Sequence, residues 1–242
     1  VVVAAGGDGT VNEVVNGLAG TAAALAVLPV GTVNVWAREI GLPLEPRAAA
    51  EAQLGVQPRN IDLGRADERY FLLMASLGFD ATVTAGVRSD LKRRIGAFAY
   101  VWEAFRLALR YEGVAAQVVI DGRRFRGRYL MVVLGNSQLY GGVVKLTAHA
   151  IIDDGLLDVC LIRGRSLLGA PLRLLSIMTR RHREDSRISY YRARRLKISS
   201  KTPIDVQVDG DYIGSAPTVF EVAPAALLAL IPNQAPPELF QR

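Results

Sequence analysis

A glycine-rich turn between an apolar strand and an amphipathic helix limits the folds open to this chain more than any other feature. Val1–Ala5 has the pattern of a buried strand, Gly6-Gly7-Asp8-Gly9-Thr10 follows it, and apolar residues then recur at helical spacing from Val11 to Leu18. A second strand, Leu25–Leu28, also leads through a glycine turn into a short helix, Val35–Ile40. This alternation of strand, turn and helix is typical of a parallel sheet in an α/β fold.

After about residue 57 the pattern changes to many short strands. Turn dipeptides such as Asp121-Gly122 and Asp154-Gly155 separate several of them, which favours an antiparallel sheet or sandwich. Two helical stretches, near 82–111 and 167–181, interrupt the strands. The predicted strands are Ile61–Arg65, Tyr70–Leu77, Ala116–Ile120, Tyr129–Leu134, Leu156–Ile162, Leu196–Ser199, Asp205–Val208 and Thr218–Val222. We therefore predict an α/β lobe over 1–57, to which 233–242 returns, and a β-rich lobe over 58–232.

Composition excludes several classes of protein and leaves the partner open. The 242 residues are 50% hydrophobic and include one cysteine, Cys160, which argues against a disordered chain or a disulfide-stapled secreted one and fits a reducing cytoplasm. No apolar segment is long and unbroken enough to predict a membrane span. The net charge is +6, yet Arg163–Lys197 alone carries eleven Arg or Lys against two acids, a net +9. Such a stretch suits a polyanion or an anionic membrane, or it is simply a solvated face.

The first glycine turn has the chemistry of a phosphate-binding loop. Glycines allow close approach of an anion, and the free N–H groups at the start of a helix point toward it. Thr10 adds a hydroxyl, whereas the Asp8 carboxylate would repel phosphate unless a cation lay between them, so the loop implies Mg²⁺ with a nucleotide. The alternative is an ordinary turn in which Asp8 or Thr10 caps the helix.

The second turn, Pro29-Val30-Gly31-Thr32-Val33-Asn34, should face the first, because carboxyl ends of adjacent parallel strands share one crevice. Together the two loops resemble those of the diacylglycerol kinase catalytic domain family, which includes sphingosine and ceramide kinases. Later segments match the family in order and spacing. They are Asn60–Gly64, Gly78–Ala81, Gly135-Asn136 with Tyr140–Gly142, Asp153–Val159 and Val208–Asp211.

The resemblance implies an ATP-dependent lipid kinase that transfers the γ-phosphate to the hydroxyl of diacylglycerol or a related membrane lipid. It implies a Rossmann-like three-layer lobe, here lacking its first strands, followed by an antiparallel β-sandwich lobe as in NAD kinases. Asp8, Asp209 and Asp211 are then the candidate catalytic acids, with Asp211 as the general base. The candidate ATP-binding residues are Gly6, Gly7, Asp8, Gly9, Thr10, Val11, Asn12, Thr32 and Asn34.

The resemblance also implies a structural Mg²⁺ at the Asp-Gly turn, held by the Asp154 side chain and the main-chain carbonyls of Ile151 and Leu156. An ordinary Asp-Gly turn is the alternative. Two positions depart from the family pattern. Val35 stands where members commonly have Asp, and Asp211 stands where they have Glu, which withdraws the carboxylate by one methylene. Because members begin about two strands earlier, we expect the 242-residue chain to bind ATP poorly.

The resemblance implies a function for the basic stretch, because a lipid kinase must work at a membrane surface. We expect Arg180–Lys197 to contribute to docking on anionic membrane, or else to be a basic hairpin facing solvent. The expected partners are ATP, a membrane lipid and a transient membrane surface, without nucleic acid, and a homodimer is allowed. The expected location is cytoplasmic and peripheral to the membrane, with a role in phospholipid biosynthesis. An NAD kinase-like enzyme and a catalytically weakened nucleotide- or lipid-binding relative are the alternatives.

Overall fold

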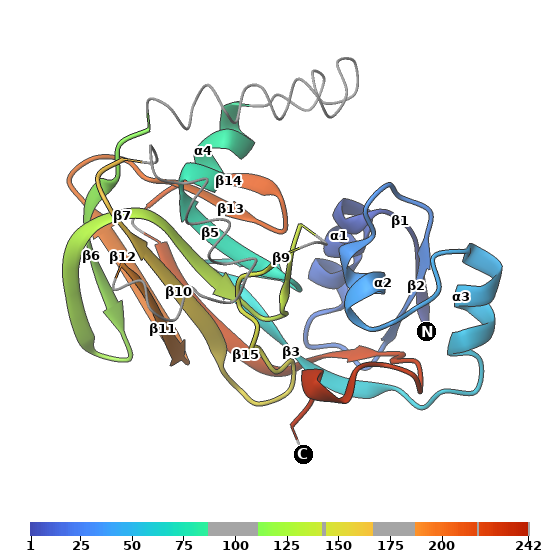
Figure 1. Cartoon of the computed structure of the whole chain (residues 1–242). Helices are drawn as coiled ribbons and strands as arrows, with labels where there is room; N and C mark the ends of the chain where they lie inside the picture. Colours follow the sequence, from blue (N-terminus) through green and yellow to red (C-terminus); the bar gives the residue numbers. More distant parts are fainter. Residues whose placement is uncertain (87–110, 142–143, 167–186, 217, 242) are drawn as a thin grey trace.

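Two lobes that share long strands make up the computed structural model of the chain. The structure describes residues 1–86, 111–141, 144–166, 187–216 and 218–241. In Figure 1 the N-terminal α/β lobe lies on the right and the β-rich lobe on the left, with β3 (Arg59–Ala66) and β15 (Thr218–Ala229) running between them. The predicted fold class, an α/β lobe plus a β-rich sandwich-like lobe, is confirmed.

The α/β lobe is built on two parallel strands. β1 (Val2–Gly6) pairs with β2 (Ala24–Pro29), and the helix between them, α1 (Asp8–Leu18), buries Val11, Val15 and Leu18 against the sheet. α2 (Val35–Glu39) follows β2 after the second glycine turn. Since β1 and β2 are parallel and in register to Gly6 and Pro29, both glycine turns leave the same edge of the sheet.

A third helix, α3 (Pro46–Gln53), which the sequence pattern did not reveal, covers β2. Pro46 opens it, and the Glu45 carboxylate caps it by accepting from the N–H groups of Arg47 and Ala48. The side-chain amide of buried Gln53 donates to the Val27 carbonyl at 2.8 Å and accepts from the Val27 N–H at 2.9 Å. These two bonds satisfy the N–H and C=O groups of Val27, which lies beyond Ala24 and Leu25, the two residues of β2 that pair with β15.

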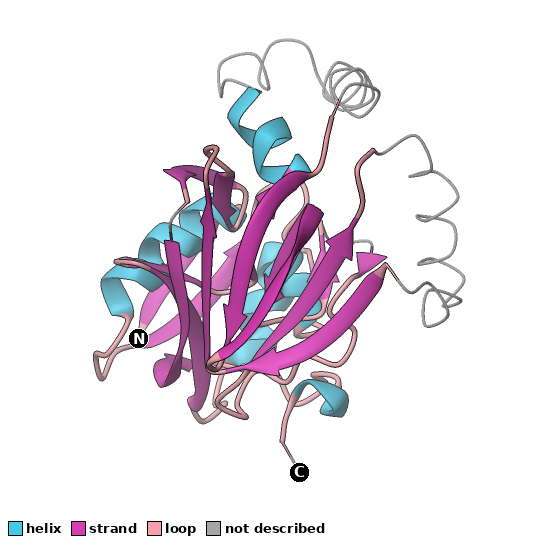
Figure 2. Cartoon of the chain, turned by 90° about the vertical axis from the view of Figure 1, so that its left-hand side faces the viewer, coloured by secondary structure: helices cyan, strands magenta, loops and turns pink. Residues whose placement is uncertain are grey.

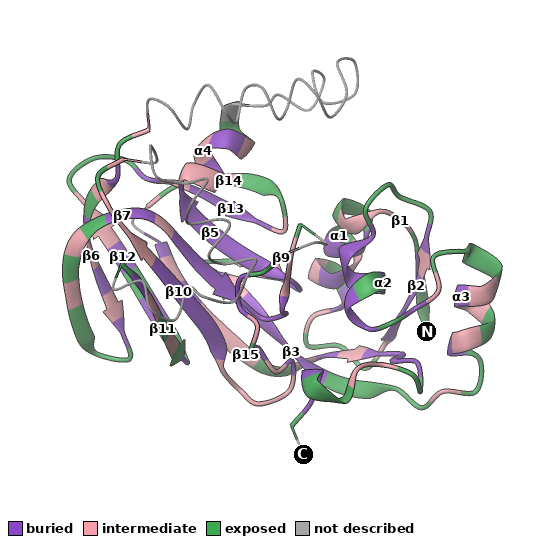
Figure 3. Cartoon of the chain, in the orientation of Figure 1, coloured by how far each residue is buried: buried purple, intermediate pink, exposed green. Residues whose placement is uncertain are grey.

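The β-rich lobe continues the same sheet. The path runs β1, β2, β15, β12 (Arg195–Ser200), β6 (Val114–Ile120), β7 (Arg123–Gly135), β5 (Met74–Gly78), β13 (Asp205–Val208) and β14 (Asp211–Ser215). β10 (Leu157–Arg163) pairs with β7 and with β11 (Ile188–Ala193), and β4 (Arg69–Phe71) pairs with β3. Figure 2 shows the long strands of this lobe side by side, and Figure 3 shows buried residues concentrated along their inner parts. The remaining elements are α4 (Phe79–Gly86), the two-stranded sheet of β8 (Leu139–Tyr140) and β9 (Val144–Lys145), and a short 3₁₀ helix at Pro237–Leu239.

β15 ties the lobes together. Its first part pairs antiparallel with β12, and its end pairs parallel with β2 through Leu228 and Ala229. One strand therefore belongs to both lobes and sets their relative position. The lobe boundaries predicted from sequence, 1–57 and 58–232 with 233–242 returning, stay a prediction.

Several predicted elements differ from the structure. The single strand predicted over Tyr70–Leu77 is broken between β4 and β5, because the N–H groups of Leu72 and Leu73 donate to the Asp209 carboxylate. β11 lies inside the basic stretch and was not among the predicted strands. Of the helical stretch predicted near 82–111, α4 covers the beginning, while 87–110 and the stretch predicted over 167–181 lie outside the described residues.

Gly64 is expected to tolerate no side chain. It stands opposite Phe71 in the β3–β4 pair, and a β-carbon added there would lie 2.0 Å from Cζ of that fully buried ring. We predict that Gly64→Ala destabilises the protein by about 1–3 kcal/mol through overpacking, measured by urea unfolding. Gly17→Ala on the exposed side of α1, where an added β-carbon meets nothing within 4 Å, is the control and should stabilise by about 0.5–1 kcal/mol. Equal effects would contradict this prediction.

Candidate active site

The two glycine turns touch each other. A β-carbon on Gly31 would lie 2.4 Å from the Gly7 Cα and 2.7 Å from the Asn34 Oδ1, so only glycine allows this approach. The Val30 N–H also donates to the Gly6 carbonyl at 3.3 Å. Gly7 is the N-cap of α1, without a side-chain cap, and its carbonyl accepts the Val11 N–H at 3.0 Å. The first turn of α1 thus presents backbone N–H groups where the second loop approaches.

Asn34 fixes the second loop from within. It adopts a left-handed conformation at the N-cap of α2, with φ 52°. Its side chain accepts from the Gly31 N–H at 3.0 Å and donates to the Gly31 carbonyl at 2.9 Å. The Asp8 carboxylate then accepts the Trp36 N–H at 3.3 Å, which ties the first loop to the start of α2. Asn34 therefore shapes the loop, while Thr10 and Thr32 are exposed beside it.

Asn12 connects the α/β lobe to the β-rich lobe. It is buried on α1, and its Nδ2 donates to the Asp209 Oδ2 at 2.6 Å. Four residues along the same face, Asn16 pairs with both backbone groups of Tyr70, accepting its N–H at 2.9 Å and donating to its carbonyl at 3.0 Å. The helix that begins at the first glycine loop is thereby fastened to β4 and to the turn after β13.

Asp209 is enclosed by hydrogen-bond donors. Besides Asn12, its carboxylate accepts the N–H groups of Leu72, Leu73 and Met74 at 2.8, 3.0 and 2.8 Å. Burial raises the pKa of Asp209 to about 6, and these hydrogen bonds oppose that rise. Because the Asp209 carboxylate already accepts these hydrogen bonds, it is better suited to hold the turn after β13 in position than to contact a substrate. Its predicted role as a catalytic acid stays a prediction.

Asp211, two residues further on, stands in the open beside α1. Its side chain is 52% exposed, and its Oδ2 lies 3.5 Å from the Nη2 of Arg69. The same Nη2 donates to the Asn12 Oδ1 at 3.0 Å and to the Glu13 carboxylate. Arg69 thus holds Asp211 next to the helix of the first glycine loop. Sequence reasoning missed Arg69 and Asn16, although the i, i+4 spacing of Asn12 and Asn16 marks one polar face of α1.

The turn that carries Asp211 has its own support. The Gly210 N–H donates to the Gln207 Oε1 at 2.7 Å, and the Gln207 Nε2 donates to Ser76 Oγ at 2.8 Å and Asp80 Oδ2 at 2.9 Å. Ser76 Oγ donates to the same Asp80 oxygen at 2.6 Å. This buried polar network joins β13, β5 and α4 beneath the turn, so the position of Asp211 is set by rigid elements.

The Asp154 turn lies in the β-rich lobe, before β10. The Asp154 carboxylate accepts the Leu156 N–H at 3.0 Å and contacts the Arg192 guanidinium, whose Nε lies 3.6 Å from Asp158. Burial raises the pKa of Asp158 to about 7. Within the described residues no group of three His, Cys, Asp or Glu side chains could hold a metal ion, whereas the predicted site would use one carboxylate and two main-chain carbonyls. The predicted magnesium site at Asp154, Ile151 and Leu156 stays a prediction.

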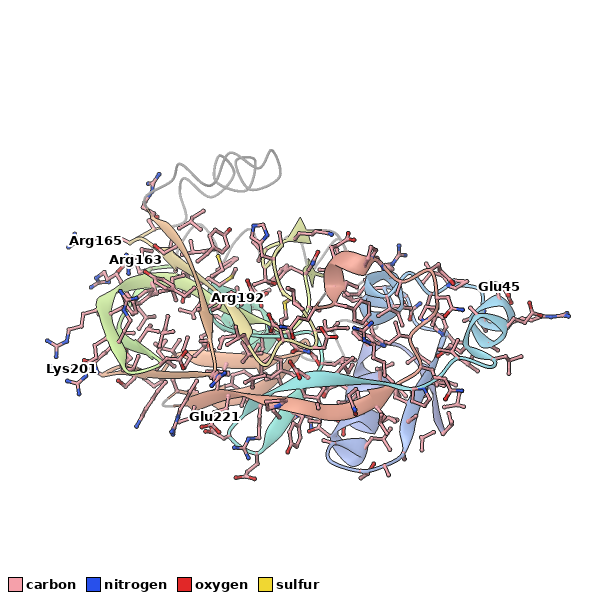
Figure 4. All side chains as sticks on the ribbon, turned by 90° about the horizontal axis from the view of Figure 1, so that it is seen from below. Glu45, Arg163, Arg165, Arg192, Lys201 and Glu221 are labelled. Carbon is pink, nitrogen blue, oxygen red and sulfur yellow. The ribbon has the colours of Figure 1, made fainter. Side chains whose placement is uncertain are left out.

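Part of the basic stretch is engaged in ion pairs. Arg192 pairs with Asp154, and Arg195 pairs with Glu221 at 3.1 Å. In Figure 4, Arg165 and Lys201 lie at the end of the β-rich lobe farthest from Glu45, where Arg126 and Arg128 help to line an open hollow of about 860 Å³. Residues 180–186 of the expected docking segment lie outside the described residues.

Comparison with known protein families identifies the family of this chain. The family described as the diacylglycerol kinase catalytic domain matches residues 1–66, and that described as the YegS C-terminal NAD kinase beta sandwich-like domain matches residues 74–231. The chain belongs to the diacylglycerol kinase family. The two family segments meet between β3 and β5, where Arg69 lies.

Curated relatives cover nearly the whole of this family member. It is 36% identical over 237 residues to the "Probable lipid kinase YegS-like" protein of Pseudomonas putida. The alignment covers 97% of this chain and 78% of that protein. It is 33% identical over 223 residues to a "Diacylglycerol kinase" of Staphylococcus aureus, covering 91% of this chain and 70% of that protein.

Solved structures agree on the fold. A putative diacylglycerol kinase from Bacillus anthracis superposes with a TM-score of 0.80 and 23% identity, over 97% of this chain and 79% of that chain. A second structure from the same organism gives a TM-score of 0.76 and 24% identity, over 94% of this chain and 76% of that chain. In the described part of this family member, no helix has the length and apolar character needed to cross a membrane.

Proposed function

We propose that this member of the diacylglycerol kinase family transfers the γ-phosphate of ATP to the hydroxyl of diacylglycerol or a related membrane lipid. The observation that carries the proposal is the position of Asp211. An open carboxylate is held through Arg69 and Asn12 beside the helix that starts at the first glycine loop. A phosphate loop and a carboxylate in one site are what phosphoryl transfer to an alcohol needs.

The two loops have the donors for the nucleotide phosphates. The backbone N–H groups of the first turn of α1 and the exposed hydroxyls of Thr10 and Thr32 would bind phosphate oxygens. Asp8 is the one acid in Gly6–Asn12 and Pro29–Asn34, and the Val35 side chain contributes no oxygen. Its carboxylate suits Mg²⁺, which prefers oxygen ligands and when bound offsets the charge of the phosphates.

Asp211 would take the proton of the lipid hydroxyl as that oxygen forms its bond to the γ-phosphorus and the bond to the bridging oxygen of ADP breaks. Arg69 would keep the carboxylate aimed at the loop, and Asp209 would hold the turn on which Asp211 stands. This division of roles fits the exposure of Asp211 and the enclosure of Asp209.

The test is a labelled-phosphate assay with Mg²⁺ and [γ-³²P]ATP, in which mixed micelles of diacylglycerol, NAD alone, and buffer alone are separate acceptor arms. We expect label in the lipid phase. Label in NADP instead would favour the NAD kinase-like alternative, and nucleotide binding without any labelled product would favour a weakened relative. Either outcome overturns the proposal.

Access to a membrane lipid would come from the basic end of the β-rich lobe. Arg126, Arg128 and Lys201 gather there around the open hollow. Cations near anionic headgroups contribute about 1 kcal/mol each. We expect co-sedimentation with vesicles that contain anionic lipid and loss of that binding in high salt, whereas sedimentation insensitive to both would contradict membrane docking.

Gly31→Ala is expected to weaken nucleotide binding at least tenfold. The new β-carbon would meet the Gly7 backbone at 2.4 Å, and backbone cannot swing aside as a long side chain can. The loops would have to separate, which would move the N–H groups of the first turn of α1 away from the nucleotide phosphates. The rate of phosphoryl transfer should fall as well, because a displacement of about 1 Å at a reacting centre can cost a factor of about 10² in rate. Titration with Mg·ATP checks this, with Gly17→Ala as control. Unchanged affinity in Gly31→Ala would show that contact between the loops is not needed.

A further inference from the structure

Two shielded carboxylates and one arginine meet at the start of β10. Asp158 and Arg192 are direct partners in the antiparallel β10–β11 pair, so their side chains share one face of the sheet. Asp154 lies four residues before Asp158, in the turn that leads into the strand. The side chains of Asp154 and Asp158 are only 5% and 10% exposed. Carboxylates so shielded need a cation or several hydrogen bonds to remain ionised.

Arg192 reaches both carboxylates. Its Nη2 contacts the Asp154 Oδ2, and its Nε lies 3.6 Å from the Asp158 Oδ2. The other Asp154 oxygen, Oδ1, accepts the Leu156 N–H at 3.0 Å. Both oxygens of Asp154 are thus engaged by groups of this chain, and the guanidinium stands at the oxygen that a metal ion would use. The donor set, arranged in this way, does not fit a magnesium ion at Asp154.

The turn that contains Asp154 is hydrogen-bonded to β3 and to the C-terminal segment. The Asp62 N–H donates to the Ile152 carbonyl at 2.7 Å, and the Asp62 carboxylate accepts the Gly155 N–H at 2.6 Å. The Ile152 N–H donates to the Leu239 carbonyl at 2.8 Å, which brings in the C-terminal segment. A cation that neutralises Asp154 therefore fixes the relation between β3, β10 and the end of the chain.

We propose that Arg192 is the resident cation of this turn, taking the place that the family resemblance gives to a structural Mg²⁺ held by Asp154 and the carbonyls of Ile151 and Leu156. The turn then keeps its shape without a divalent ion. This inference concerns stability and does not depend on the proposed kinase activity.

The first test is thermal unfolding of the purified protein without nucleotide, in excess EDTA and in millimolar MgCl₂. We expect the same midpoint in both. Arg192→Gln should lower the midpoint by about 2–8 °C, because it leaves the shielded carboxylates without their cation. Arg195→Gln, which removes an exposed partner of Glu221 from the neighbouring strand, is the matched control and should shift it far less. A midpoint in Arg192→Gln equal to that of the control would overturn the proposal.

The second test remains informative if Arg192→Gln fails to fold. Mn²⁺ binding to the unaltered protein is followed by electron paramagnetic resonance without nucleotide, and compared with that of Asp154→Asn. We expect the same number of bound ions in the two proteins. A bound ion that is lost in Asp154→Asn, together with a midpoint that falls in EDTA, would show that a metal and not Arg192 occupies this turn.

Discussion

Asp211→Asn is expected to lower kcat for lipid phosphorylation by about 10²–10⁴, because the amide cannot accept the proton of the lipid hydroxyl. The change keeps the size of the side chain and leaves the glycine loops untouched, so the affinity for Mg·ATP should stay within about twofold, since surface substitutions usually change free energies by less than 0.5 kcal/mol. Initial rates of labelled-lipid formation and a nucleotide titration on the same preparation measure the two quantities separately.

Two further variants sharpen this prediction. Asp211→Glu restores the longer carboxylate of the family pattern, and we expect it to retain activity that Asp211→Asn loses. Glu51→Gln, which neutralises an exposed acid on α3 that pairs with Arg47, is the control for loss of a surface charge. If Asp211→Asn retained the rate of this control, Asp211 would not be the base.

Asp209→Ala is expected to cost about 3–5 kcal/mol of folding free energy. The substitution removes the acceptor of three backbone N–H groups, those of Leu72, Leu73 and Met74, and of the buried Asn12 amide. Each buried donor left without a partner costs about 1–3 kcal/mol, although the turn can relax and admit water. Urea unfolding measures the loss. Asp211→Ala, two residues away on an exposed side chain, should cost less than about 1 kcal/mol. Similar losses in both variants would contradict the positioning role.

Asp209 also gives stability a pH dependence. Its pKa in the folded protein is about 6, raised by burial from an ordinary value of 3.8, so the folded state holds its proton more tightly than the unfolded chain does. The stability that this adds is fully present below pH 3.8 and is lost as pH rises through about 6. This contribution to the free energy of unfolding should therefore decrease by up to about 3 kcal/mol as the pH rises from 3.8 to about 6. Asp209→Asn should lack it, and an unchanged pH profile in that variant would contradict the assignment.

The local parts of the site could be predicted from the sequence. Both glycine loops follow parallel strands at the same sheet edge, and that rule predicted that the loops face each other, as the close approach of Gly31 to Gly7 shows. Residue spacing also predicted the helix of α1, since Val11, Val15 and Leu18 mark its buried face. These features depend on periodicity and turn chemistry, which neighbouring residues determine.

The links between distant segments, within and between the lobes, could not be predicted, because they join residues far apart in the chain. Arg69 and Asn12 are separated by 57 positions, and Arg192 and Asp154 by 38. The break in the strand at Leu72 depends on the carboxylate of Asp209, 137 positions away. Strand β11 was not predicted, because the local charge of the basic stretch favoured a solvated face. In the structure Arg192 lies next to Asp158 on the adjacent strand β10 and contacts Asp154 in the turn before β10.

The central claim is that the two glycine loops hold the nucleotide phosphates next to the turn that carries Asp211. Hydrogen–deuterium exchange of the purified protein, with and without Mg²⁺ and a non-hydrolysable ATP analogue, tests it most directly. We expect slower exchange at the amides of 6–12 and 31–36, which form the facing loops. Unchanged exchange at both loops, with protection at the basic hollow lined by Arg126, Arg128 and Lys201 instead, would contradict the claim.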